Sequence, residues 1–193
     1  MTETRIIVVA AAKGGVGKTT LAYELAAALG AVRVDLDWDA GGATRMWGFD
    51  PTTAVRAPLL DALERGPDVR PPRPKRRPNQ PALVPSHPDL SATTVDPDLV
   101  ADCLQAWGAQ WDTRFVVVDT HPGANPLTDG ALQVADVVVV PAVLANREMA
   151  ALEAMLVDLG EFNVVVAPTM VPNIPPRRYV DRLEELARGR HRV

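Results

Sequence analysis

The chain has 193 residues, of which 47% are hydrophobic and 23% are charged, the composition of a globular protein that can bury a sizeable core in one domain. Its formal net charge of −4 means that the molecule as a whole is not positively charged, so any contact with nucleic acid must come from a local basic patch. The single cysteine, Cys103, excludes an internal disulfide, and no stretch approaches the ~20 apolar residues of a membrane span. We therefore expect a cytoplasmic protein of bacterial type, with one domain over residues 1–193 and Cys103 buried.

Apolar runs of strand length alternate with helical patterns along the chain. The predicted strands cover Arg5–Ala12, Ala31–Leu36, Phe115–Asp119, Asp136–Pro141 and Asn163–Pro168. The predicted helices cover Thr19–Leu29, Asp98–Trp107, Asn125–Ala135, Arg147–Leu159 and Pro176–Arg188. Runs such as Val137–Val140 are apolar on both faces, as central strands of a covered parallel sheet require. The pattern therefore predicts an α/β fold, a doubly wound, mostly parallel sheet flanked by helices.

Residues 65–97 differ from the rest, because nine of the chain's 18 prolines lie there. Proline at this density disfavours a helix and favours extended chain. The first part is also basic, with Asp68 as its acid and these cations: Arg65, Arg70, Arg73, Lys75, Arg76 and Arg77. Two interpretations stay open, a solvated and partly mobile connection, or a basic arm for a phosphate backbone or an acidic partner. A short strand is predicted at Ala82–Val84.

A glycine-rich stretch, Ala12–Thr20, follows the first strand and opens the first helix, which is the context that a phosphate-binding loop requires. Glycines let the backbone turn tightly and point its N–H groups inward. Lys18 is expected to reach the β- and γ-phosphates, and the Thr19 hydroxyl to hold a magnesium ion. The residues expected to bind the nucleotide are Gly14, Gly15, Val16, Gly17, Lys18, Thr19 and Thr20. The strict pattern has a glycine where this chain has Ala12, and a second lysine, Lys13, follows it.

Carboxylates end two further predicted strands. Asp35 and Asp37 end the second strand and share one face, and Asp119 ends the run Phe115–Asp119 in a Walker B pattern. In open α/β sheets, ligands bind at the carboxyl ends of the strands. Asp119 is therefore expected to hold magnesium with Thr19, directly or through water, and Asp35 to support the site through hydrogen bonds.

The run Lys-Gly-Gly-Val-Gly-Lys-Thr-Thr at residues 13–20 resembles the deviant Walker A motif of the ParA/MinD ATPases. The run Asp-Thr-His-Pro-Gly at residues 119–123 resembles the stretch with which that family senses the γ-phosphate. The resemblance extends from about Arg5 to Leu186 and is weak between Thr52 and Leu83. Within the family, the chain most resembles the ParA/Soj partition proteins. Members of the family extend further, so this chain is either a minimal member or a truncated one.

The resemblance implies ATP as substrate, Mg²⁺ as cofactor, and a homodimer that sandwiches the nucleotides. In such a homodimer, the resemblance implies that Lys13 reaches the phosphates of the nucleotide bound to the partner subunit. It also implies that Asp37 positions the attacking water. Pro168 and Thr169 are expected near the adenine base. The family has Pro-Gln where this chain has Trp38-Asp39, and Pro or Ala where it has His121. Asp39 either perturbs the water or faces solvent, and His121 is expected to be a surface histidine rather than a titrating group of the site.

The function that the resemblance implies is a slow ATPase that times a switch between an ATP-bound dimer and an ADP-bound monomer. Such a protein acts in plasmid or chromosome partition on the nucleoid, through non-specific DNA binding and a ParB-like or cargo adaptor. A candidate DNA edge, alternatively a solvated helix face, contains Arg177, Arg178, Arg182, Arg188, Arg190 and Arg192. Two alternatives are a ParA-like ATPase that positions a protein cargo, and a MinD-like membrane switch. The apolar stripe for the membrane switch is Val180, Leu183, Leu186 and Ala187.

Overall fold

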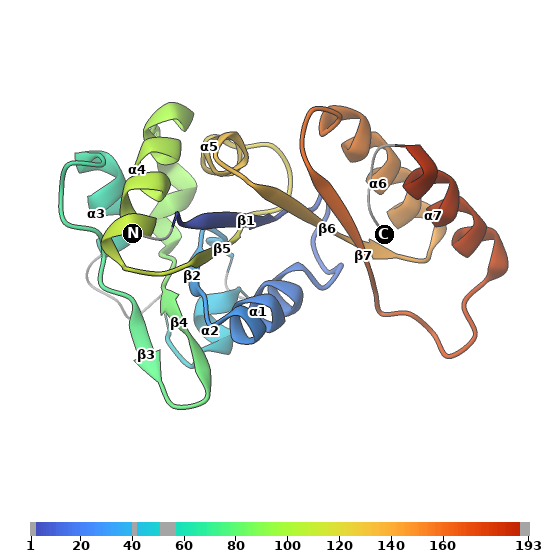
Figure 1. The fold of residues 1–193 in the computed structure, drawn as a ribbon, viewed down its shortest axis with the longest axis horizontal. Coiled ribbons are helices and arrows are strands. Elements are labelled where there is room, and N and C mark those ends of the chain that lie inside the picture. Colours follow the sequence, from blue (N-terminus) through green and yellow to red (C-terminus); the bar gives the residue numbers. More distant parts are fainter. Residues whose placement is uncertain (1–2, 40–41, 51–56, 190–193) are drawn as a thin grey trace.

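The computed structural model describes residues 3–39, 42–50 and 57–189, and a seven-stranded sheet runs through it in the order β3-β4-β2-β5-β1-β6-β7 (Figure 1). The strands are β1 Arg5–Val9, β2 Val32–Asp35, β3 Lys75–Arg77, β4 Gln80–Val84, β5 Phe115–Asp119, β6 Val137–Val143 and β7 Val164–Thr169. Neighbouring strands are parallel, except that β3 is antiparallel to β4. The predicted fold class is therefore confirmed.

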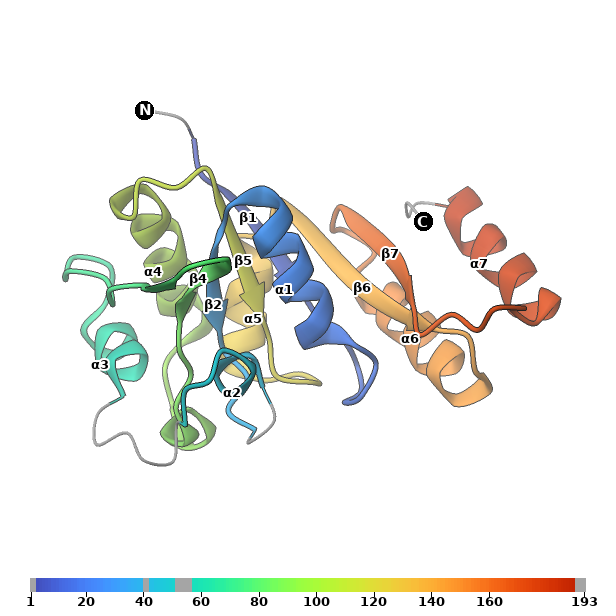
Figure 2. The same ribbon diagram turned by 90° about the horizontal axis from the view of Figure 1, so that it is seen from below.

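Helices lie on both faces of the sheet. They are α1 Lys18–Leu29, α2 Ala43–Met46, α3 Pro58–Arg65, α4 Pro97–Gln110, α5 Pro126–Gln133, α6 Asn146–Asp158 and α7 Arg177–Gly189, with a 3₁₀ helix, η2, at Pro88–Ala92. Because side chains alternate along a strand, Val8 of β1 joins the larger core under α4, α5 and α6, whereas Val9 faces α1. Figures 1 and 2 show α1 and α2 on one side of the sheet and α3, α4 and α5 on the other.

The five predicted strands and five predicted helices are all present, and most of their ends lie within one to three residues of the expected ones. The prediction that Pro141 closes its strand is wrong, because β6 continues to Val143 in register with β7. β1 pairs with β6 only as far as Val139. Beyond Val139, β6 has no neighbouring strand on the side of β1 among the described residues. Pro141, which lacks an N–H group, is therefore tolerated within the strand.

Residues 65–97 form more structure than the sequence predicts. The short strand expected at Ala82–Val84 is part of β4, and β3 adds an antiparallel edge to it. Trp111 donates from its indole Nε1 to the Pro72 carbonyl oxygen over 3.1 Å, which fixes the proline-rich chain against the end of α4. Trp47 packs with Leu83 and donates from its indole Nε1 to the Pro81 oxygen over 3.2 Å.

The C-terminal helix packs through its apolar side. Leu183 of α7 is buried in the larger core, and Leu186 is half-buried against it. This face of α7 is therefore occupied by contacts within the chain. No helix among residues 3–39, 42–50 and 57–189 is long and apolar enough to cross a bilayer. Arg190 and Arg192 lie outside the described residues, and Cys103 is buried as expected.

Candidate nucleotide site

The glycine-rich loop connects β1 to α1 and requires glycine at two positions. Gly15 and Gly17 have φ values of +78° and +88°, which side-chain-bearing residues rarely adopt. The first turn of α1 contains no acidic residue, so the positive end of the helix dipole is not neutralised within the helix. The loop therefore presents backbone N–H groups and a helix N-terminus, which suits an anion.

Lys18 joins the carboxylates of two strand ends. Its Nζ donates to Oδ1 of Asp119 over 2.7 Å and to Oδ2 of Asp37 over 3.2 Å, and only 5% of Lys18 is exposed. Burial alone lowers the pKa of Lys18, but Asp119 and Asp37 outweigh it and hold that pKa above its usual value. The structure thus brings together three residues that span 101 positions of the sequence, from Lys18 to Asp119.

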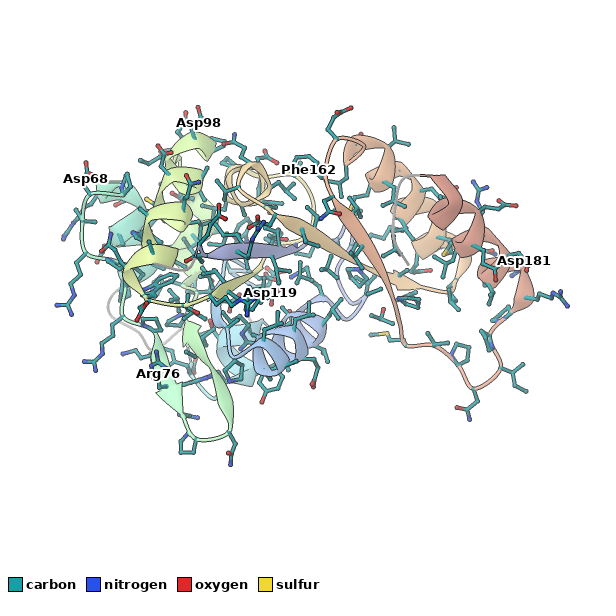
Figure 3. The ribbon with its side chains drawn as sticks, in the orientation of Figure 1. Asp68, Arg76, Asp98, Asp119, Phe162 and Asp181 are labelled. Atoms are coloured by element: carbon teal, nitrogen blue, oxygen red, sulfur yellow. The ribbon has the colours of Figure 1, made fainter. Side chains whose placement is uncertain are left out.

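Asp119 is fully buried at the end of β5, in the central part of the molecule (Figure 3). Burial raises its pKa, and the neighbouring Lys18 and Thr19 act against that rise. Its Oδ2 is buried and makes no hydrogen bond with the described residues. A buried, unpartnered carboxylate oxygen beside a threonine hydroxyl fits a hard cation that prefers oxygen ligands, such as Mg²⁺.

Asp35 organises the turn after β2. Its Oδ1 accepts from the Asp37 N–H over 3.1 Å, and its Oδ2 accepts from the Thr44 N–H over 2.7 Å and from the Thr44 hydroxyl over 2.5 Å. The expected supporting role of Asp35 is therefore confirmed. Burial and the nearby Asp119 raise its pKa to about 7, although the hydrogen bonds from Thr44 and Asp37 act in the opposite direction.

Arg33 is a buried cation that the sequence analysis missed. It is 0% exposed on β2, lies 5.4 Å from the Tyr23 ring, and donates from Nη2 to the Ala43 oxygen over 3.2 Å. Burial lowers its pKa, while Asp35 and Asp119 act to raise it. Asp35 and Asp119 are thus close enough to influence the Arg33 charge, but Arg33 forms no ion pair with either among the described residues, and its Nε and Nη1 are buried there without a hydrogen-bond partner. The signal in the sequence is a charged residue inside the otherwise apolar run of residues 31–34.

Asp39 and His121, the two departures from the family pattern, lie against each other. Nε2 of His121 is 3.5 Å from Oδ2 of Asp39, and the imidazole stacks on Trp38 at 3.8 Å between ring centres. Asp39 also donates its N–H to Oδ1 of Asp37 over 3.1 Å. His121 is a partly exposed loop histidine, close to the expectation, and its contacts also join the loop after β5 to the chain segment that holds Asp37. One ligand atom each from Asp37, Asp39 and His121 lies within 4.8 Å of the others, close enough to share a cation.

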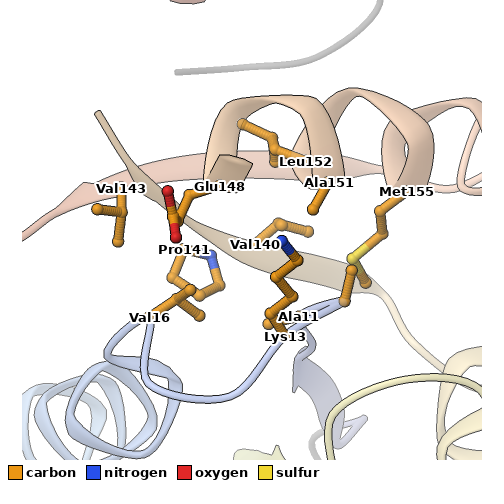
Figure 4. Close-up of a pocket in the computed structure, with 11 residues that line it drawn as sticks. Ala11, Lys13, Val16, Val140, Pro141, Val143, Glu148, Ala151, Leu152 and Met155 are labelled. Carbon is orange, nitrogen blue, oxygen red and sulfur yellow. The ribbon is translucent and has the colours of Figure 1, made fainter. Parts of the chain in front are cut away.

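Lys13 extends from the glycine-rich loop toward α6 (Figure 4). It is exposed, and its Nζ donates to the carbonyl oxygen of Arg147, in the first turn of α6, over 3.4 Å. Figure 4 shows its side chain extending from the loop toward α6, beside Glu148 and Met155. Lys13 therefore takes no part in the contacts of Lys18 within its own chain.

Of the two β7 residues predicted near the adenine base, Pro168 and Thr169, only Thr169 contacts the glycine-rich loop. The Thr169 hydroxyl donates to the Val16 oxygen over 2.8 Å, so Thr169 lies against the loop. Pro168 lines an apolar hollow on the other side, with Leu144, Val171 and Leu183. Adjacent residues of a strand face opposite ways, which explains why the two separate.

The fold, the loop and the strand-end carboxylates define a nucleotide-binding protein of the P-loop class. The chain matches the model of the AAA domain family over residues 4–167 and belongs to that family. The predicted resemblance to the ParA/Soj branch is confirmed by two relatives, each 32% identical to it. The ParA chromosome partitioning protein of Caulobacter vibrioides aligns over 71% of this chain and 55% of its own length.

The second relative, the chromosome-partitioning ATPase Soj of Thermus thermophilus, aligns over 87% of this chain and 66% of its own length. This chain thus spans a little more than half to two thirds of the length of these relatives. Among solved structures, cobyrinic acid a,c-diamide synthase from Mycobacterium smegmatis, with a bound ATP analogue and magnesium, superposes with a TM-score of 0.75 at 25% identity. That alignment covers 96% of this chain and 80% of the synthase chain.

Proposed function

We propose that this chain is an ATP-dependent dimerising switch of the ParA type, which acts in DNA partition through non-specific DNA binding and slow ATP hydrolysis. The observation that carries the proposal is the cluster of Lys18, Asp37 and Asp119 at the strand ends, with Lys13 directed toward α6. The 32% identity to ParA and Soj proteins supports the same assignment.

ATP is the proposed substrate, and Mg²⁺ the proposed cofactor. The amides of residues 14–20 and the ammonium group of Lys18 bind the phosphates, and Thr19 with Asp119 holds the ion. Magnesium neutralises charge on the transferring phosphoryl group. The free Oδ2 of Asp119 and the absence of acids from the first turn of α1 support this arrangement.

Asp37 is the proposed water-positioning residue. Its carboxylate is 8% exposed and is held from both sides, by the Lys18 ammonium group and by the Asp39 N–H. A fixed carboxylate beside the phosphate site can orient a water molecule for in-line attack. We assign the reaction to hydrolysis, with water as the phosphoryl acceptor.

We propose that Lys13 of one subunit contacts the phosphates of the nucleotide bound to the other subunit. Its ammonium group makes one long hydrogen bond, to a carbonyl oxygen, and pairs with no carboxylate among the described residues. A cation held this weakly is available to phosphates that a second copy presents. Hydrolysis then requires two subunits, so the rate of hydrolysis sets how long the ATP-bound dimer lasts.

The experiment that tests the proposal measures the molar mass of the purified chain by light scattering, with ATP and Mg²⁺ and with ADP and Mg²⁺, together with phosphate release. We expect a dimer with ATP, a monomer with ADP, and a specific hydrolysis rate that rises with protein concentration. A monomer with ATP whose specific rate does not depend on concentration would overturn the dimerising switch. Binding to anionic vesicles, measured in parallel, would instead favour the membrane-associated alternative.

A further inference from the structure

One end of the sheet carries five exposed cations that we call the basic edge: Arg65, Arg70, Arg73, Lys75 and Arg76. They lie between the last residue of α3 and β3, which is the outermost strand of the sheet. Figure 1 shows this segment along the end of the molecule formed by α3 and β3, and Figure 3 labels Arg76 and Asp68 there. Asp68 is the only acidic residue from 65 to 77.

No carboxylate among the described residues forms an ion pair with a member of the basic edge. The neighbouring Arg77 differs, because it donates to the Trp47 oxygen over 2.7 Å and lies 4.3 Å from the Trp47 ring centre. Arg77 therefore fastens the β3–β4 hairpin, while the five cations before it face solvent. Charged residues on an edge strand can prevent two sheets from pairing edge to edge. This protection does not explain Arg65, Arg70 and Arg73, because they precede β3.

The other candidate for an anion-binding face is α7, where two of the arginines with described side chains are engaged within the chain. Arg182 pairs with Glu153 and with Glu185, each over 2.7 Å, and Arg177 lies 3.9 Å from Asp181. Arg178 donates to the Tyr179 hydroxyl over 2.8 Å. Arg178 and Arg182 are therefore engaged within the chain, whereas the Arg177 side chain is 93% exposed, and the basic edge offers the larger number of described cations without an ion pair.

The basic edge is also held in place. Pro71, Pro72 and Pro74 restrict the backbone between its members, and Trp111 fixes the Pro72 carbonyl. From Arg70 to Arg76 an extended chain spans up to about 20 Å. Duplex DNA advances 3.4 Å per base pair, so that length corresponds to about six base pairs of phosphates. A fixed row of cations of this length fits a duplex backbone better than a small anion, since binding requires little further ordering.

We propose that the basic edge is the DNA-contacting surface of this protein, and that it binds the phosphates of duplex DNA without reading bases. The inference rests on the proposed function and deepens it by assigning the DNA contact to β3 and the chain before it, not to α7. Strands β4, β2 and β5 separate β3 from β1, which leads into the nucleotide loop. The edge therefore stays uncovered when a second copy faces the loop.

Fluorescence anisotropy with a labelled random-sequence duplex tests the proposal, with ATP, with ADP and without nucleotide, between about 50 and 200 mM salt. The edge variant is Arg73→Ala with Arg76→Ala, and the matched control is Arg177→Ala with Arg178→Ala. With ATP, we expect the edge variant to lose at least about 10-fold in affinity and its log–log salt slope to fall by about 2. The control and the charge-retaining variant, Arg73→Lys with Arg76→Lys, should stay within about threefold of wild type. Nucleotide binding, which these positions do not touch, reports that each variant is folded.

The outcomes separate the inference from the function on which it rests. If wild type binds DNA with ATP but the edge variant binds equally well, the basic edge is not the DNA surface, although the switch proposal stands. Loss of binding in the α7 variant alone would return the contact to α7 and overturn the inference. If wild type binds no DNA with any nucleotide but binds polyglutamate through the edge, the partner is an acidic protein, and both the inference and the DNA role fail.

Discussion

The Nζ atom of Lys18 lies 2.7 Å from Oδ1 of Asp119, and both side chains are almost fully buried. Asp37 adds a second carboxylate at 3.2 Å, so two buried negative charges surround one ammonium group. A buried charge is costly unless it is paired, and each member of this cluster therefore depends on the others. The same lysine is the one that phosphates would need, which couples nucleotide binding to the stability of the strand ends.

Replacement of Lys18 by alanine should abolish tight ATP binding, with a loss of at least about 100-fold in affinity. It should also destabilise the fold at neutral pH by about 3–5 kcal/mol, because Asp37 and Asp119 then remain buried without their cation. Titration with a fluorescent ATP analogue and urea denaturation at pH 7.5 measure the two effects. Lys13→Ala, at an exposed position, should leave both quantities near wild type. Wild-type affinity in Lys18→Ala would remove Lys18 from the phosphate site.

Lys13→Ala should retain ATP binding but lose hydrolysis, by at least about 10-fold in kcat, if the lysine acts on the nucleotide of a second subunit. Mixing gives a sharper result than the single variant. Lys18→Ala cannot bind its own nucleotide but still carries Lys13, so adding it to Lys13→Ala should restore part of the phosphate release. A Lys13→Ala protein that hydrolyses ATP normally as a monomer would show that the sandwich dimer is wrong.

Asp37→Ala should stop turnover while it leaves the ATP-bound dimer intact. A positioned carboxylate contributes about 10²- to 10⁴-fold to such reactions, so kcat should fall by at least about 100-fold. Light scattering with ATP and single-turnover phosphate release separate assembly from chemistry. Asp39→Asn is the control, because it keeps the backbone N–H that binds Asp37 and removes only the carboxylate beside His121. Equal losses in both variants would assign the effect to the turn rather than to Asp37.

The parts of the structure that local pattern determines could be predicted from the sequence. The glycine-rich loop and the apolar strands depend on residues close together in the chain, so the runs around Gly17 and Val116–Asp119 were sufficient. The meeting of Lys18 with Asp119 also followed, because parallel strands bring their carboxyl ends to one edge of the sheet. The hydrogen bonds of Asp35 were expected in kind but not in their partners.

Features that depend on contacts between distant residues were missed. The role of His121 depends on the placement of Trp38 and Asp39 across the sheet edge, which no local pattern encodes. The antiparallel β3 has three exposed residues and no apolar alternation, and the docking of Arg77 on Trp47 holds it. Helix α3 was also not predicted, although Pro58 and Gly66 mark its two ends in the sequence.

Asp35→Asn should flatten the dependence of stability on pH. The pKa of Asp35 is about 7 in the folded protein and 3.8 in an ordinary carboxyl group, so the folded state binds the proton more tightly. The free energy of unfolding therefore falls as pH rises from about 4 to about 7, by about 1.4 kcal/mol for each unit of pKa shift. Urea denaturation at pH 5 and pH 7.5 measures the slope, with Asp68→Asn as an exposed control. Equal slopes in wild type and Asp35→Asn would place the pH dependence elsewhere.

Gly130→Ala should destabilise the protein, although alanine is usually favoured over glycine in a helix by about 1 kcal/mol. A Cβ on Gly130 of α5 would collide with the Pro97 carbonyl oxygen and lie 2.6 Å from Cβ of Val100. Neither atom can yield without moving α4, so a net loss of about 1–3 kcal/mol is expected in thermal or urea unfolding. Gln105→Ala, on the exposed side of α4, should change stability by less than about 0.5 kcal/mol. A more stable Gly130→Ala protein would mean that α4 and α5 are not held in this contact.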